Sequence, residues 1–439
     1  MNNPFKSVLD IRRKELPLAL LMFGYFFLVI TSFWILKPLK KTLFITFYKN
    51  DGLNLLGWEL TGSQAELLAK VLNMVVAFLA VIIFTWLSRK YRRQQLTFIF
   101  SSFFIFSYIV YSFIINTPGH FTVWSFYLFG DLFSTLMVAT FFTFLNDSVT
   151  PESAKRLYGL IGLGGVTGGV FGTSVVRVWI KSMEMSSWLW ICLGIALTII
   201  FLAYLAGKLV SRIAIETTVA ETPKTKKVNP AIEGAKLVFN SPYLIAIVGI
   251  VGLYEIVSTI MDFQFTATIE HFVPADSIGT HFSTVFAITN VVSLIVQLFL
   301  TSFIMTRFGL AVALSILPIM ILLGSAGFMI VPVLWAGSFL NTADNGFSYS
   351  INQSAKETLY VPTSKDEKYK AKAFIDMFVQ RFAKAIAVVI SLGITTIFKD
   401  YSSIRWLSLF TLVIVVIWLY AVRYVGKKFK EYTESGTIA

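Results

Sequence analysis

The chain has 439 residues, of which 56% are hydrophobic and only 14% are charged. No soluble fold of this length hides so many apolar residues, so the composition predicts an integral membrane protein and excludes a soluble one. The net charge is +13, yet the basic residues gather on alternate connections between apolar segments, which argues against a nucleic-acid partner. One cysteine, Cys192, and three histidines without zinc-type spacing predict neither a disulfide framework nor a metal or other cofactor site.

Hydropathy predicts twelve membrane-spanning helices, each close to or above the ~20 residues that a helix needs to cross hydrocarbon. In chain order they cover residues 16–41, 66–87, 96–115, 122–146, 158–180, 187–207, 242–265, 281–305, 308–330, 332–354, 371–398 and 406–422. The predicted fold is therefore an all-α integral membrane protein of twelve transmembrane helices.

The basic residues predict the topology. They cluster before the first span and on the connections after even-numbered spans, which the positive-inside rule places in the cytoplasm together with both termini. The basic N-terminus precedes an apolar run too long for a signal peptide, so it is expected to be an uncleaved first helix. Without transit-peptide composition, we expect a bacterial cell (inner) membrane.

The long connection at 208–240, rich in Thr, Lys and Pro over 216–230, predicts a linker between two halves. The expected domains are a six-helix bundle at 1–214, a cytoplasmic linker at 215–238 and a six-helix bundle at 239–439. A short repeat agrees with this division, because Ser-Ala-Lys follows both the fourth span and the tenth.

Charges inside the spans follow a period of three: spans 3, 6, 9 and 12 contain none. A charge in hydrocarbon costs at least ~2.5–3.5 kcal/mol, so it normally faces a partner or a water-filled cavity. Span eight has only the neutral Asn290 and Gln297 and is the weakest member of the polar set. The charged members are Lys37, Lys40, Lys41, Lys70, Asp131, Arg177, Glu255, Asp262, Asp344, Asp376, Arg381 and Lys384.

This periodicity matches the cavity-lining helices of the major facilitator architecture, in which two six-helix halves enclose a central site. For any single residue the alternative is a snorkelling side chain or a lock between helices. The glycines from Gly162 to Gly172 in span five suggest a nucleotide-binding turn, but no strand precedes them. Small residues at this spacing favour close helix packing or gating instead.

Three segments carry a resemblance to a known family. They are 354–386, 35–44 (Ile-Leu-Lys-Pro-Leu-Lys-Lys-Thr-Leu-Phe) and 154–165 (Ala-Lys-Arg-Leu-Tyr-Gly-Leu-Ile-Gly-Leu-Gly-Gly). Together they resemble the nucleotide transporter family, the ATP:ADP antiporter group of intracellular bacteria and plastids. The resemblance covers about a quarter of the chain and implies twelve helices of facilitator type that move nucleotides, ATP against ADP plus phosphate.

The resemblance also implies which charges serve transport. The family's first-helix lysine corresponds to Lys40, with Lys37 at the position of an arginine, and its fourth-helix acid corresponds to Asp131. The seventh-helix glutamate corresponds to Glu255, and a further lysine corresponds to Lys356. Three departures leave the substrate open: Lys41 replaces an acid, Asp131 replaces a glutamate, and 381–388 replaces a Gly-Lys-Ser-Gly-Gly-like stretch.

We therefore hypothesise alternating access through a basic central cavity, since embedded bases outnumber embedded acids and attract polyanions. Alternatives are a carrier of another phosphorylated or anionic metabolite, a lipid-precursor flippase or scramblase, and a membrane-embedded enzyme, against which no catalytic constellation appears in the spans. The protein is expected to be a non-enzymatic monomer. The candidate substrate-binding residues are Lys37, Lys40, Lys70, Asp131, Arg177, Glu255, Lys356, Arg381 and Lys384.

Overall fold

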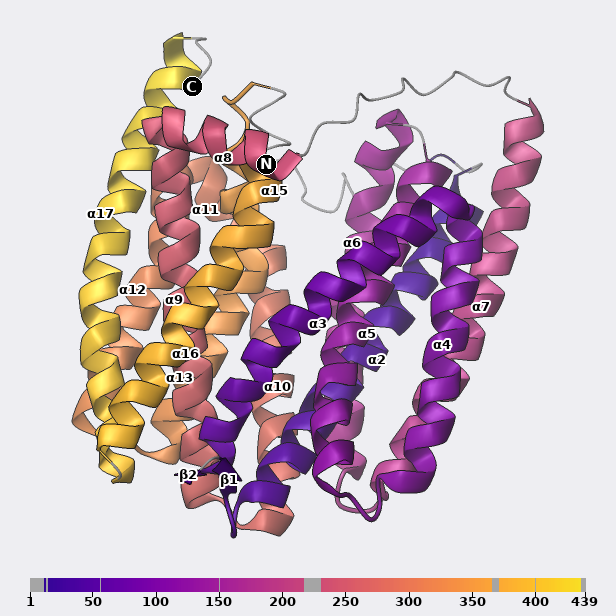
Figure 1. Ribbon diagram of the computed structural model, residues 1–439. Helices are drawn as coiled ribbons and strands as arrows, with labels where there is room; N and C mark the ends of the chain where they lie inside the picture. The colour runs from indigo at the N-terminus through magenta and orange to yellow at the C-terminus, as the bar shows by residue number, and fades with distance from the viewer. Residues whose placement is uncertain are drawn as a thin grey trace. The chain divides into compact units, whose positions relative to one another are not determined.

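The computed structural model describes residues 12, 15–55, 57–149, 151–216, 230–364, 371–398 and 400–435. This part of the chain is built mainly of helices (Figure 1). Its strands are β1 (Leu53–Leu55) and β2 (Trp58–Leu60), an antiparallel hairpin in which Leu53 pairs with Leu60. Gly57 has φ +87° in the connection, a backbone conformation that favours glycine.

The chain divides into two compact units. Unit 1 comprises Met1–Asn50, Leu72–Pro223 and Asp276–Asn290, and unit 2 comprises Asp51–Val71, Lys224–Ala275 and Val291–Ala439. Each unit thus includes a short segment from the other half of the sequence: residues 276–290 in unit 1 and residues 51–71 in unit 2. The expected boundaries at 214 and 238 remain a prediction, because most of the expected linker lies outside the described residues.

Unit 1 is built around α2 (Leu16–Tyr48), which packs against α5, α6 and α7. Its remaining helices contribute one core with fully buried aromatic side chains such as Tyr25, Phe104 and Phe126. These helices are most of α3 (Gly62–Lys90), α4 (Arg93–Ile114), α5 (His120–Ser148), α6 (Pro151–Trp179), α7 (Met185–Glu216) and the start of α10 (Ile278–Ile295).

Unit 2 is built in the same way around α9 (Pro242–Phe272), which packs against α13, α16 and α17. The first helix of each half therefore packs against the corresponding later helices, as parallel repeats predict. The other segments are α8 (Pro230–Asn240), η1 (Ala275–Ser277) before α10, η2 (Val296–Thr301), α11 (Ser302–Arg307), α12 (Leu310–Ile330), α13 (Leu334–Phe347), η3 (Ser348–Asn352), α14 (Gln353–Thr358), α15 (Lys372–Phe374), η5 (Ile375–Val379), α16 (Gln380–Ile397), η6 (Tyr401–Ile404) and α17 (Arg405–Ser435).

The four spans without charges form two packed pairs, α4 with α7 and α12 with α17. Their outer faces expose large apolar side chains, among them Phe106, Leu197, Leu323 and Val416. In a membrane protein such faces are suited to contact with lipid, which agrees with the absence of charge from these spans.

Eleven helices in the described residues are long and apolar enough to cross a membrane. The expected tenth span, 332–354, instead falls on α13, η3 and α14, and the first and longest of these has 14 residues. The change from α- to π-helix at Ser348 divides this continuous helical run. The all-α membrane fold is therefore confirmed, and the count of twelve stays a prediction.

The first span is longer than hydropathy indicates. We predict its end at Lys41, but α2 continues to Tyr48. Pro38 and three lysines lower the hydropathy there, yet the helix continues through the proline, and the Thr42 hydroxyl donates to the Pro38 carbonyl at 2.7 Å. Lys37, Lys40 and Lys41 consequently lie inside the helix, about two to three turns before its end.

The glycines of α6 form the contact with α2, as the packing interpretation predicts. A Cβ atom at Gly164 would lie 2.7 Å from the Phe23 carbonyl oxygen, and one at Gly172 would lie 2.7 Å from that of Thr31. The Thr31 hydroxyl donates to the Gly168 carbonyl at 3.2 Å. The backbones approach too closely to admit a side chain.

Gly164→Ala is therefore expected to lower the free energy of unfolding by about 1–3 kcal/mol, because the Phe23 backbone must shift. Gly162→Ala is the matched control, since its Cβ meets nothing within 4 Å, and it should stabilise by roughly 0.5–1 kcal/mol. Thermal unfolding of both variants in detergent checks this. Equal effects would show that the glycines serve no packing role.

Candidate functional site

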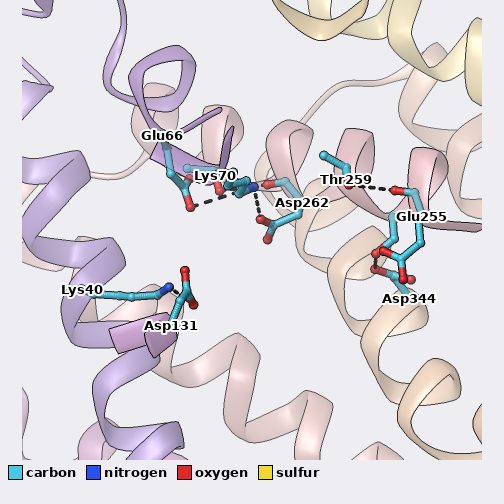
Figure 2. Close-up of polar contacts among 10 residues, drawn as sticks. Lys40, Glu66, Lys70, Asp131, Glu255, Thr259, Asp262 and Asp344 are labelled. Carbon is cyan, nitrogen blue, oxygen red and sulfur yellow. Dashed lines mark hydrogen bonds and ion pairs between the residues drawn. The ribbon is translucent and has the colours of Figure 1, made fainter. Parts of the chain in front are cut away.

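The central feature of unit 1 is an ion pair between α2 and α5. The Lys40 side chain is 5% exposed and its ammonium group bonds to the Asp131 carboxylate (Figure 2). The ammonium group also lies 4.2 Å from the centroid of the Tyr127 ring, one helical turn before Asp131. Gly130 makes room for this lysine, because a Cβ there would lie 2.8 Å from Lys40 Cδ. Tyr127, Gly130 and Asp131 of α5 thus together position the Lys40 side chain.

The two neighbouring lysines of α2 face aromatic rings. The Lys37 ammonium group lies 4.5 Å from the Trp34 ring centroid and 4.9 Å from that of Phe286 on α10. Lys41 is 3% exposed, and its ammonium group lies 5.5 Å from the Phe282 ring. Rings that present their negative faces stabilise a cation without adding an acid, so these contacts allow unit 1 to hold basic groups away from water.

In unit 2, α3 begins against α9. Lys70 pairs with Asp262 and lies 4.0 Å from Glu66 one turn earlier (Figure 2). The Glu270 carboxylate accepts hydrogen bonds from the backbone N–H groups of Gly62 at 2.7 Å and Ser63 at 2.8 Å. A carboxylate at a helix N-terminus satisfies free donors and complements the helix dipole. The start of α3 therefore contacts α9 at two points, through the Lys70–Asp262 ion pair and through the Glu270 carboxylate at its N-terminus.

Glu270→Ala is expected to destabilise the protein by about 1.5–3 kcal/mol, the usual contribution of hydrogen bonds to a charged group. Glu270→Gln keeps one acceptor oxygen and should cost less. Ser186→Ala, at an exposed hydrogen bond at the start of α7, serves as the control and should leave the melting temperature unchanged. A larger loss for glutamine than for alanine would contradict this capping role.

A second ion pair joins α9 to α16. Lys384 Nζ lies 3.4 Å from Glu255 Oε2, and the side chains are 48% and 12% exposed. The acid is thus held in the protein while the base reaches its surface. Arg381 lies one turn before Lys384 and is partly buried. This arrangement gives unit 2 a paired acid and base, as unit 1 has in Asp131 and Lys40.

Two candidate substrate-binding residues, Arg177 and Lys356, lie outside the Lys40–Asp131 and Lys384–Glu255 ion pairs. Arg177 is exposed in the last turn of α6, and Lys356 is partly exposed on the short helix α14. The side chain of Asp376 lies outside those that the structure describes.

Sequence reasoning missed the groups that position the bases. Tyr127 contacts the Lys40 ammonium group, and Gly130 leaves room for the Lys40 side chain. Tyr127 lies four residues before Asp131, which places the two on the same face of α5. That spacing is a signal that could have been used. Asp262 was recognised as an embedded acid, but its partner Lys70 lies 192 residues away in the sequence. No local pattern connects the two.

The fold is that of major facilitator-type transporters. The nucleoside transporter NupG matches with a TM-score of 0.63 and 12% identity over 94% of this chain and 99% of that one. A bacterial homologue of the iron transporter ferroportin matches with a TM-score of 0.64 and 11% identity, covering 94% and 99%. At this identity the likeness establishes the architecture.

The chain belongs to the TLC ATP/ADP transporter family, whose model matches residues 117–335 and 329–429. ADP,ATP carrier protein 1 of Chlamydia pneumoniae is 23% identical, over 95% of this chain and 92% of that protein. The chloroplastic ADP,ATP carrier protein 1 of Arabidopsis thaliana is 21% identical over 95% and 74%. The family match confirms the resemblance, and its ranges include two of the three segments, 154–165 and 354–386. It identifies a multi-pass membrane protein of a carrier family.

Proposed function

We propose that this protein exchanges ATP for ADP across a membrane by alternating access, without altering either nucleotide. The observation that carries the proposal is the Lys40–Asp131 pair, a base and an acid held together inside the membrane-spanning region of a member of this family. A phosphate group is an anion, as the carboxylate is, and can replace it at the lysine. Substrate binding then exchanges one ion pair for another.

The Glu255–Lys384 pair in unit 2 can work in the same way, with Arg381 as a second donor. Lys384 is the more accessible partner, so an incoming phosphate can reach it from its exposed side and then replace the Glu255 carboxylate. Arg381 can bond a phosphate through two donors at once, while Lys384 acts as a mobile point charge. Four further candidate substrate contacts have weaker support. Lys37 faces aromatic rings and Lys70 pairs with Asp262. Arg177 and Lys356 lie in the last turns of their helices.

Counterflow in proteoliposomes tests the function. Vesicles loaded with ADP should take up radiolabelled ATP, and the label should be recovered as ATP, whereas empty vesicles should take up little. Chemically altered label would indicate an enzyme. Competition by sugar phosphates or other organophosphates stronger than by ADP would favour the alternative substrate class, which the replacement of a glutamate by Asp131 keeps open.

We further propose a monomer in a bacterial inner membrane, with both termini and the connection at 217–229 in the cytoplasm. The clustering of basic residues before the first span and around this connection supports the orientation. Reporter fusions at 229 and at 118 should report opposite sides of the membrane. The same side for both would overturn the orientation.

A further inference from the structure

The turn between α3 and α4 in unit 1 carries a basic cluster that the proposed exchange does not use. The sequence there reads Arg-Lys-Tyr-Arg-Arg over residues 89–93. α3 ends at Lys90, Arg92 is the N-cap of α4, and Arg93 is the first residue of that helix. The side chains of Arg89, Lys90 and Arg92 are exposed, and these three residues are called the basic turn below.

Polar contacts fix the backbone of this turn. The Arg93 guanidinium group donates to the Ser88 carbonyl at 2.9 Å and to Asp147 Oδ2 at 2.8 Å. It thereby joins the start of α4 to the ends of α3 and α5. The Arg92 backbone N–H donates to Gln95 Oε1 at 2.9 Å. The basic turn therefore presents its charges from a fixed position.

The charge of the basic turn is not balanced locally. Within the described residues, none of its three members pairs with a carboxylate. The basic end of α17 differs, because Lys428 pairs with Glu431 at 2.7 Å and Lys430 lies 3.7 Å from Glu434. Uncompensated positive charge on a surface attracts anions, so the basic turn is suited to an anionic partner and the end of α17 is less so.

An exposed apolar stripe on α3 leads to the basic turn. Arg89 and Lys90 follow Trp86 by three and four residues, which places all three on one face of the helix. The Lys90 ammonium group lies 5.6 Å from the centroid of the Trp86 ring. Tryptophan is enriched at the level of lipid headgroups. The stripe consists of side chains about half exposed or more: Val75, Phe78, Leu79, Ile82, Ile83 and Trp86.

We propose that the basic turn and the apolar stripe together bind an anionic phospholipid. Its phosphate contacts Arg89 and Lys90, and its acyl chains lie along the stripe, so the order of apolar and charged groups on α3 matches that of the lipid. Basic clusters next to a membrane-spanning helix attract anionic lipids. A zwitterionic headgroup adds a cation beside the phosphate, which the three bases repel, so the site favours lipids of net negative charge.

Native mass spectrometry of the purified protein in detergent, with added phosphatidylglycerol or phosphatidylcholine, tests the selectivity. The wild type should retain phosphatidylglycerol more tightly. Arg89→Gln with Lys90→Gln should lower that affinity roughly 30-fold, because each basic residue near an anionic surface contributes about fivefold. Lys428→Gln with Lys430→Gln removes the same charge from balanced lysines and should change little. Equal retention of both lipids by the wild type, or equal losses in the two double variants, would overturn the proposal.

Two further measurements separate a lipid site from a site for free anions. Ile83→Ser with Trp86→Ser keeps every cation and should lower the affinity for phosphatidylglycerol several-fold, because the acyl chains lose apolar contacts. Inorganic phosphate at millimolar concentration and constant ionic strength should not displace the lipid. Displacement by phosphate, or an unchanged affinity in the serine variant, would contradict the lipid site. Melting temperatures in lipid-free detergent should match the wild type within a few degrees, which shows that the variants are folded.

Discussion

Lys40→Gln is expected to weaken ATP binding about 10- to 100-fold, while binding of uncharged adenosine stays nearly unchanged. The lost contact is a charged hydrogen bond to phosphate in a partly desolvated place, which contributes about 1.5–3 kcal/mol. Glutamine keeps a donor of similar reach and removes the charge. Calorimetric titration of the purified protein with both ligands measures the difference.

Two further variants separate binding from folding. Lys40→Gln alone leaves Asp131 without its cation, which destabilises the protein. The double variant Lys40→Gln with Asp131→Asn removes both charges and should recover the melting temperature but not the affinity for ATP. Lys427→Gln, near the exposed end of α17, should change neither. An ATP affinity restored in the double variant would assign Lys40 to structure.

The membrane spans and their polar content could be predicted from the sequence because hydrocarbon penalises charge strongly and locally. A lysine such as Lys70 or an acid such as Asp262 is conspicuous in an apolar run whatever its partner. The partnership itself could not be predicted, because it joins the start of α3 to α9 across 192 residues. The fold and the embedded charges therefore followed from the sequence, whereas the pairing of Lys70 with Asp262 required the structure.

The end of α2 and the π-helical turns also could not be predicted from the sequence. Hydropathy ends the first span at Lys41 because lysines precede that point, whereas α2 continues to Tyr48. The Lys41 ammonium group there lies 5.5 Å from the Phe282 ring on α10, a contact that no local pattern shows. The widened turns of η2, η3 and η5 are likewise tertiary features. No residue type marks a π-helical turn, and Ser348–Asn352 has the same polar pattern as an ordinary helix end.

The two acids that pair with bases have a role that a phosphate ligand cannot have. An ionised Asp131 repels phosphate, yet it compensates Lys40 when no substrate is present. In an exchanger this is useful, because the empty carrier can neutralise its own base, and the occupied carrier must break that pair. The acid therefore competes with the substrate and sets how readily the empty carrier changes conformation.

Asp131→Asn is accordingly expected to tighten ATP binding roughly fivefold to tenfold, since a partly buried ion pair contributes on the order of 1 kcal/mol that substrate no longer displaces. Net uptake into vesicles without internal nucleotide should fall by about tenfold or more, because the empty carrier returns with an unpaired Lys40, whereas ATP/ADP exchange should persist. Equilibrium binding and the two transport modes measured on one preparation separate these effects. Thr135→Ala, one turn further along α5, keeps the ion pair and controls for helix packing. If Asp131→Asn binds ATP more weakly than the wild type, the acid supports the site instead of competing for it, and the exchange of ion pairs at Lys40 is wrong.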